Sequence, residues 1–182
     1  MKKWGTILAS TLLAGAAVAI AQQNPMVGGH DMLPSMNIVQ NAMNSNDHTT
    51  LVAAVKAAGL VDTLEGAGPF TVFAPTNEAF AQLPAGAVDN LLKAENKDML
   101  VKVLTYHVVA GKWDSKAIAK QIREGGGKAQ LKTVSGGTLW ASMSGKTLVL
   151  TDEKGGTARV TIANVYQSNG VIHVIDAVLM PN

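Results

Sequence analysis

The sequence predicts an α+β fold, with several helices in the N-terminal half and mostly antiparallel strands in the C-terminal half. Apolar residues recur at helical spacing up to about residue 124. From residue 129 onward, short β-rich runs alternate with glycine-containing turns. Helices and strands do not alternate as βαβ units, so we expect them to segregate. A length of 182 residues suits one domain with one core.

The first 21 residues have the features of a secretory signal peptide. Lys2 and Lys3 precede an apolar stretch over residues 7–20, and Ala19-Ile20-Ala21 is a small-x-small cleavage signal. The stretch is too short for a stable membrane span, so we expect no membrane insertion after its removal. The remaining 161 residues carry 13 Lys and Arg against 13 Asp and Glu. The signal peptide predicts a secreted or periplasmic protein, and the neutral balance predicts that it binds no nucleic acid.

Residues 22–36 predict a flexible leader, because they contain two prolines and two glycines and show no periodicity. Met26, His30, Met32 and Met36 place three thioethers and an imidazole within eleven residues of it. Soft ligands of this kind select Cu(I). The alternative is a tether that is Met-rich by composition alone. No other cofactor is predicted.

Residues 37–182 form the predicted domain, which begins with helices. One helix is expected over residues 37–43, and a clearer one runs from a cap at Asp47 to a stop at Gly59. A short turn follows. The later helical patterns cover residues 88–92, residues 96–104 after an Asn96 cap, and residues 115–124 after a cap at Asp114 or Ser115.

The rest of the chain is organised around the stretch from Gly68 to Phe80. Residues 70–74 are apolar on both faces and suit a strand that is covered on two sides. Pro75 cannot donate to a ladder, so the strand is expected to end there. Thr76 then offers a side-chain oxygen as a helix N-cap, with Phe80 on the inward face of the short helix.

The remaining strands are predicted from β-favouring runs. A strand is expected over residues 105–109. Asn169-Gly170 between two such runs is a strong hairpin signal. The other predicted strands cover residues 129–134, 138–143, 147–151, 157–162, 163–167 and 171–176.

The sequence contains no recognisable catalytic constellation. The absence of cysteine excludes disulfides and a thiol nucleophile, and no two histidines have the i, i+4 spacing of a helical zinc site. No Gly-x-Ser-x-Gly elbow or phosphate loop is present. We therefore predict that the protein is not an enzyme, although a Ser-His-Asp triad built from distant segments stays open. His173 is predicted as a core histidine with a backbone partner, and a functional role is the alternative.

The pair Tyr106-His107, flanked by Leu104, Val108 and Val109, is the candidate partner-binding site. Tyrosine is favoured at interfaces, which supports a contact patch. The alternative is a tyrosine packed by its ring and a histidine hydrogen-bonded at the start of a strand.

Three segments together resemble the fasciclin domain family. They are residues 70–80 (the first box), the Tyr106-His107 pair, and residues 169–181 (the second box). Their order and spacing also match, so the resemblance covers about residues 35–182. The residues that carry the structural signature are Phe73, Pro75, Thr76, Asn77, Phe80, His173, Asp176 and Pro181.

The resemblance implies a compact wedge of two β-sheets with helices packed at one side and the two boxes as neighbouring core strands. Members of the family act as extracellular adhesion or matrix-associated modules. Animal relatives engage integrins partly through the region that corresponds to Tyr106-His107. Thr76, Asn77 and Asp176 are implied to fix backbone geometry. Glu78 departs from the aspartate that many relatives carry at this position.

These observations predict an exported, non-enzymatic binding module for cell-surface, adhesion or extracellular-matrix association. Its expected partner is a surface protein or a polysaccharide. The alternative is a periplasmic ligand- or copper-handling protein that uses the Met/His leader.

Overall fold

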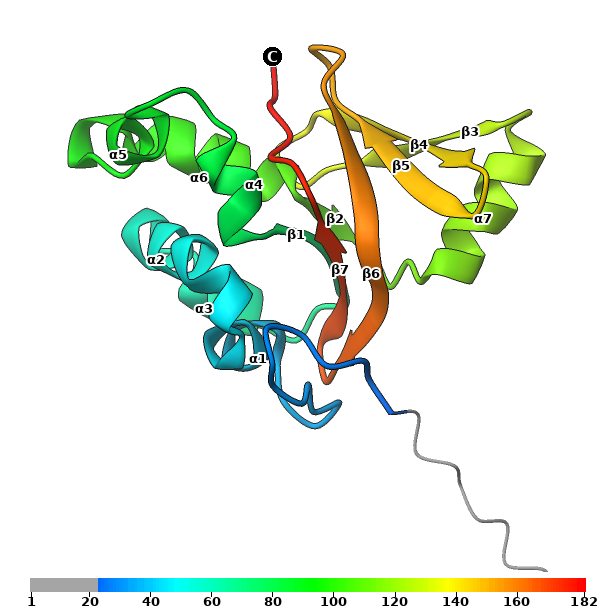
Figure 1. The fold of residues 1–182 in the computed structure, drawn as a ribbon, viewed down its shortest axis with the longest axis horizontal. Coiled ribbons are helices and arrows are strands. Elements are labelled where there is room, and N and C mark those ends of the chain that lie inside the picture. Colours follow the sequence, from blue (N-terminus) through cyan, green and yellow to red (C-terminus); the bar gives the residue numbers. More distant parts are fainter. Residues whose placement is uncertain (1–22) are drawn as a thin grey trace, which may run out of the picture.

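The computed structural model describes residues 23–182, so the predicted signal peptide lies outside the described residues. Most of the helices gather on one side of a long twisted sheet, and α7 lies on the other side, as Figure 1 shows. The helices are α1 (Ile38–Asn44), η1 (Asn46–His48), α2 (Thr49–Ala58), α3 (Val61–Glu65), α4 (Asn77–Ala81), α5 (Ala87–Leu91), η2 (Ala94–Asn96), α6 (Lys97–Tyr106) and α7 (Ser115–Glu124). The strands are β1 (Phe70–Pro75), β2 (Val108–Ala110), β3 (Lys128–Lys132), β4 (Thr138–Ser144), β5 (Thr147–Thr151), β6 (Thr157–Gln167) and β7 (Gly170–Ile175).

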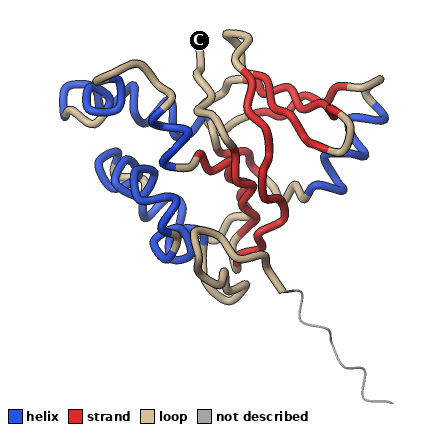
Figure 2. Tube along the Cα trace, viewed as in Figure 1, coloured by secondary structure: helices blue, strands red, loops and turns tan. Residues whose placement is uncertain are grey.

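The seven strands follow the order β2-β1-β7-β6-β5-β4-β3. The long strand β6 pairs with β5 near its start and with β7 along its later part, so it joins two sheets (Figure 2). A bridge between Val109 and Thr133 brings β2 close to the chain after β3 and nearly closes the wedge. The predicted α+β class and the wedge of two sheets are confirmed.

The two boxes meet in the parallel pair β1 and β7, in register from Phe70 opposite Gly170 to Pro75 opposite Ile175. All six residues of β7 and the last five of β1 are buried, as expected for a pair covered on both faces. The prediction that the boxes form neighbouring core strands is therefore confirmed.

Alternate side chains of these strands enter two different cores, because successive residues of a strand point to opposite faces. Val72 and Ile172 pack in the core shared with α1, α2, α3 and α6. Phe73 and Ile175 pack in the core shared with α7 and the β3–β5 sheet. Figure 1 shows the same division, with α1–α6 on one side of β1 and β7 and α7 on the other. The paired strands β1 and β7 therefore form a partition between two cores: the helix-side core next to α1–α6 and the core next to α7.

Two element predictions are corrected. The strand expected over residues 105–109 is shorter, because α6 continues through Tyr106 and β2 begins at Val108. His107 ends that helix, because its side chain forms a hydrogen bond with the Val103 carbonyl of the last turn. The two strands expected over residues 157–167 form the single strand β6, which bends at register shifts beside Asn164, whose φ is 61°.

The predicted flexible leader is also corrected, because residues 23–36 pack against the domain. Val27 and Met32 are 3% and 4% exposed and belong to the helix-side core. The Asn24 side chain accepts a hydrogen bond from the Tyr166 N–H (2.7 Å) and donates one to the Met32 carbonyl (3.1 Å). The proline and glycine content predicted a flexible leader, but two buried side chains and the hydrogen bonds of Asn24 fix the segment in place.

Candidate functional site

The five residues predicted as a partner-binding patch are buried inside the domain. The exposed fractions of its five residues lie between 0% and 5%, so a partner cannot reach them in this structure. The residues are Leu104, Tyr106, His107, Val108 and Val109. The expectation rested on the enrichment of tyrosine at interfaces, which says nothing about where the fold places a particular tyrosine.

Tyr106 instead joins α6 to the meander. Its hydroxyl donates to the Thr138 carbonyl (2.8 Å) and accepts from the Glu153 N–H (3.1 Å). Burial is the main cause that raises the pKa of Tyr106 to about 12, so the hydroxyl keeps its proton at neutral pH. Gly137 lies against the ring, where an added Cβ would come within 2.7 Å of Cε2.

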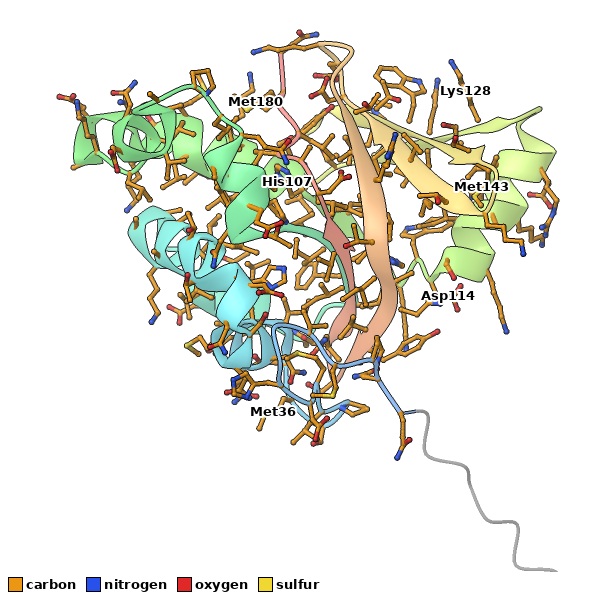
Figure 3. The ribbon with its side chains drawn as sticks, viewed as in Figure 1. Met36, His107, Asp114, Lys128, Met143 and Met180 are labelled. Carbon is orange, nitrogen blue, oxygen red and sulfur yellow. The ribbon has the colours of Figure 1, made fainter. Side chains whose placement is uncertain are left out.

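His107 joins α6 to the C-terminal segment, and Figure 3 shows it at the centre of the molecule beneath that segment. Its Nδ1 donates to the Val103 carbonyl (2.8 Å), and its Nε2 accepts from the Leu179 N–H (3.0 Å). These partners define the tautomer of a neutral ring. Burial lowers the pKa of His107 to about 4, so the ring is uncharged at neutral pH.

Asn77 of the first box caps a helix other than its own. Its Oδ1 accepts from the Thr50 N–H (3.0 Å) and the Thr49 hydroxyl (3.2 Å), and its Nδ2 donates to the Asn46 carbonyl (2.9 Å). The residue before α2 provides no side-chain cap, so Asn77 satisfies that end from α4. Thr76 caps α4 itself through the Ala79 N–H (3.2 Å).

The second box contains two further positioning residues. His173 is fully buried, donates from Nε2 to the Trp113 carbonyl (2.8 Å) and stacks on Phe73 with 5.6 Å between ring centroids. Burial lowers the pKa of His173. Asp176 accepts from the Arg159 N–H (2.7 Å). The other signature residues also lie on this framework, with Phe80 and Pro181 buried and Pro75 at the end of β1.

Asp152 is a buried positioning residue that the sequence analysis missed. It is 4% exposed and accepts from the N–H groups of Gly156 (2.7 Å), Lys154 (3.0 Å) and Met180 (2.9 Å). The first two bonds close the turn before β6, and the third holds the C-terminal segment. An aspartate ahead of a glycine-containing turn is the signal that could have indicated it.

The four proposed copper ligands lie in different environments. Met32 is buried in the core, whereas Met26 is 58% exposed. The Nε2 atom of His30 lies 3.2 Å from the side-chain nitrogen of Asn46. Within residues 23–182, no group of three or more His, Cys, Asp or Glu side chains is placed to hold a metal. Met32 packs in the core and is therefore not an exposed ligand, whereas copper binding by Met26, His30 and Met36 stays a prediction.

The exposed feature that stands out is a groove between α7 and the strands β4, β5 and β6. Its volume is about 690 Å³. Its lining includes three exposed cationic side chains and, among the described residues, no carboxylate. The lining residues are Ser115, Lys116, Ala119, Arg123, Met143, Lys146, Thr147, Leu148, Val160, Thr161 and Ala163. Figure 3 shows Met143 at the end of this sheet beside α7.

The sequence positions the groove cations on two elements. Ile118 and Ile122 bury one face of α7, which fixes the helix on the sheet. Lys116 and Arg123, two turns apart, then lie along one side of the helix. Lys146 reaches the groove from the turn between β4 and β5.

Two contacts define the start of α7 and its charge environment. The side-chain oxygen Oδ1 of Asn164 accepts from the Ser115 N–H (2.7 Å), which ties the helix to the bend in β6. Glu124 forms an ion pair with Lys120 (3.7 Å), and neither residue lines the groove. The carboxylate of Glu124 therefore does not neutralise the cations of the groove lining.

The sequence analysis missed the groove because the neutral net charge after the predicted signal peptide hides an uneven distribution of charge along the chain. Residues 112–159 carry nine Lys and Arg against four Asp and Glu, a net charge of +5. Residues 23–111 carry four against eight, a net charge of −4. A charge count by segment would have indicated a basic half.

Comparison with known proteins identifies the family. The family model described as Fasciclin domain matches residues 46–181. The chain belongs to the fasciclin domain family. Protein sll1483 of Synechocystis is 45% identical over 192 residues, covering 100% of this chain and 99% of that protein. Immunogenic protein MPB70 of Mycobacterium bovis is 37% identical, covering 77% of this chain and 66% of that protein.

A solved structure shows the same fold. The FAS1 domain pair of the insect cell adhesion molecule Fasciclin I matches with a TM-score of 0.72 at 19% identity, over 80% of this chain and 51% of that chain. Within residues 23–182 of this fasciclin domain, no helix has the length and apolar character needed to cross a membrane.

Proposed function

We propose that this fasciclin-domain protein is an exported, non-enzymatic adhesion module that binds an acidic polysaccharide at the cell surface or in the matrix. The groove between α7 and β4–β6 is the binding site. The observation that carries the proposal is its set of three exposed cations, Lys116, Arg123 and Lys146, without a lining carboxylate. The matched relatives include a protein described as a cell surface glycolipoprotein and an insect cell adhesion molecule, which supports a surface role.

The chemistry of the lining favours a sugar polymer that carries carboxylates. Lysine and arginine form charge-assisted hydrogen bonds with carboxylates. The hydroxyls of Ser115, Thr147 and Thr161 can exchange hydrogen bonds with sugar hydroxyls. None of the lining side chains is aromatic, whereas proteins that bind single-stranded nucleic acid stack bases on aromatic rings. A polyuronate is therefore the ligand class that fits this groove.

The histidines support a binding role over a catalytic one. His107 and His173 are buried, and both ring nitrogens of each have backbone partners. A general base needs a ring nitrogen that can reach a substrate proton. Among the described residues, both rings of this pair use their nitrogens in backbone hydrogen bonds that stabilise the fold, so neither presents a nitrogen to a substrate.

Titration of polygalacturonate into the purified chain at low ionic strength tests the proposal. The variant Lys116→Gln/Lys146→Gln removes one cation from each side of the groove and is expected to weaken binding by about tenfold or more. The control Lys93→Gln/Lys97→Gln removes the same charge from the acidic half and is expected to bind like the wild type. Neutral dextran is expected not to bind.

Salt adds a second readout, because binding that pairs cations with carboxylates weakens as ionic strength rises. If both variants lose affinity equally, net charge and not the groove drives the binding, and the site assignment is wrong. If wild-type protein shows no saturable binding to polygalacturonate, the ligand class is wrong.

A further inference from the structure

A second cavity lies on the opposite side of the partition, between α1–α3 and the helix-side face of β1, β2 and β7. Its volume is about 60 Å³, and its walls are almost entirely apolar. Representative wall residues are Ile38, Leu51, Val55, Val72, Leu104 and Ile172. Its lining continues to the exposed residues Lys56 and Thr63, so the cavity is connected to the protein surface.

His48 presents an unpaired polar atom in this apolar cavity. The side chain is 3% exposed and lines the cavity. Its Nδ1 lies 2.8 Å from the Ser45 hydroxyl, but its Nε2 has no hydrogen-bond partner. The Ala74 carbonyl lies near enough to influence the ring, yet it does not meet hydrogen-bond geometry. A buried unpaired donor or acceptor costs about 1–3 kcal/mol, so Nε2 gains from a ligand oxygen.

The other polar side chains that line the interior already have partners. Asn41 bonds with the backbone of Leu33 and with the Gln167 side chain. Both ring nitrogens of His107 are bonded to backbone groups. Within residues 23–182, Nε2 of His48 is the buried side-chain nitrogen or oxygen that lacks a partner. The cavity therefore offers one polar point in an apolar enclosure.

We propose that this cavity binds a slim aliphatic molecule with one neutral oxygen, an alcohol or a ketone, which hydrogen-bonds with Nε2 of His48. An engineered cavity of about 150 Å³ holds benzene, so a cavity of about 60 Å³ favours an aliphatic molecule smaller than benzene. Burial lowers the pKa of His48, and a neutral ring suits a neutral oxygen better than a carboxylate. The two tautomers of the ring accept from a hydroxyl or donate to a carbonyl.

NMR titration of the isotope-labelled chain with 1-propanol and acetone tests this inference, with propanoate as the charged comparison. Saturable shifts are expected at the His48 ring and at the methyl groups of Leu51, Val55 and Ile172. The charged probe is expected to bind more weakly. The variant His48→Phe keeps the apolar volume and is expected to weaken binding of the two neutral probes by about tenfold.

Two further variants separate a ligand site from a packing effect. Ala42→Leu places extra volume in the cavity wall and is expected to abolish the shifts, even if His48→Phe fails to fold. His30→Phe changes an exposed histidine outside the cavity and is expected to bind like the wild type. If neither neutral probe gives saturable shifts, or if Ala42→Leu binds normally, the cavity is not a ligand site. The polysaccharide-groove variant Lys116→Gln/Lys146→Gln is expected to leave these shifts unchanged.

Discussion

The backbone N–H of Leu179 donates a hydrogen bond to Nε2 of His107, 3.0 Å away and 72 residues earlier in the chain. The same ring donates to the Val103 carbonyl, so one side chain closes α6 and holds the C-terminal segment. The neighbouring Tyr106 joins the same helix end to β4 and to the turn before β6. The Tyr-His pair therefore acts as a junction between distant segments of the fold.

His107→Ala is expected to destabilise the fold by about 3–5 kcal/mol, because it leaves buried backbone groups unpaired and opens a cavity. Urea unfolding followed by circular dichroism measures this loss. The control His30→Ala removes an exposed histidine and is expected to change stability by less than about 0.5 kcal/mol. Equal stability of the two variants would contradict the junction role.

Stability is expected to fall as the pH drops from 7 to 5. Burial lowers the pKa values of His48, His107 and His173 in the folded protein, to about 4 for His107, from an ordinary value of 6.5. Below pH 6.5 the unfolded chain therefore binds protons that the folded chain does not, and the free energy of unfolding decreases with falling pH. For His107 alone the full effect is on the order of 3 kcal/mol near pH 4.

Urea unfolding at pH 7, 6 and 5 measures this dependence. The variant His107→Gln lacks one of the titrating groups and is expected to show a shallower slope, by up to about 1.4 kcal/mol per pH unit. His30→Gln serves as the control for the substitution itself. A wild-type unfolding free energy that stays constant over this range would contradict the assignment of buried neutral rings.

Local signals were sufficient to predict the framework of the fold. Pro75 and Thr76 fix the end of β1 and the start of α4 through their own backbone chemistry, and Gly59 ends α2 with a φ of 71°. Burial could not be predicted in the same way. Tyr106 and Met32 have side chains that suit an interface or a ligand as well as a core, and tertiary packing alone decides between these roles.

The basic groove could not be predicted from spacing, because its cations come from α7 and from the turn between β4 and β5. Lys116 and Lys146 each have the character of a solvated surface residue when the sequence is considered alone. The side chain of Asn164, at the bend in β6, ties the start of α7 to the sheet beside the groove. Such a long-range tie has no sequence signature.

Asn77→Ala is expected to destabilise the protein by about 1–2 kcal/mol, the usual loss for a helix cap. The substitution removes the acceptor for the Thr50 N–H and the donor to the Asn46 carbonyl. Asn77→Asp keeps the acceptor and is expected to cost less than Asn77→Ala. Chemical denaturation of both variants gives the comparison, and an alanine variant as stable as wild type would exclude tertiary capping of α2.

Met32→Ala tests whether the segment before α1 belongs to the domain. Met32 is 4% exposed in the helix-side core, so its truncation is expected to cost about 2–5 kcal/mol. Met26→Ala is the matched control, because this methionine is 58% exposed and its truncation is expected to cost less than about 0.5 kcal/mol. A freely moving tether would make the two substitutions equally harmless in urea unfolding. A large difference between them instead identifies residues 23–36 as part of the core, which Asn24 fastens to β6 through the Tyr166 N–H.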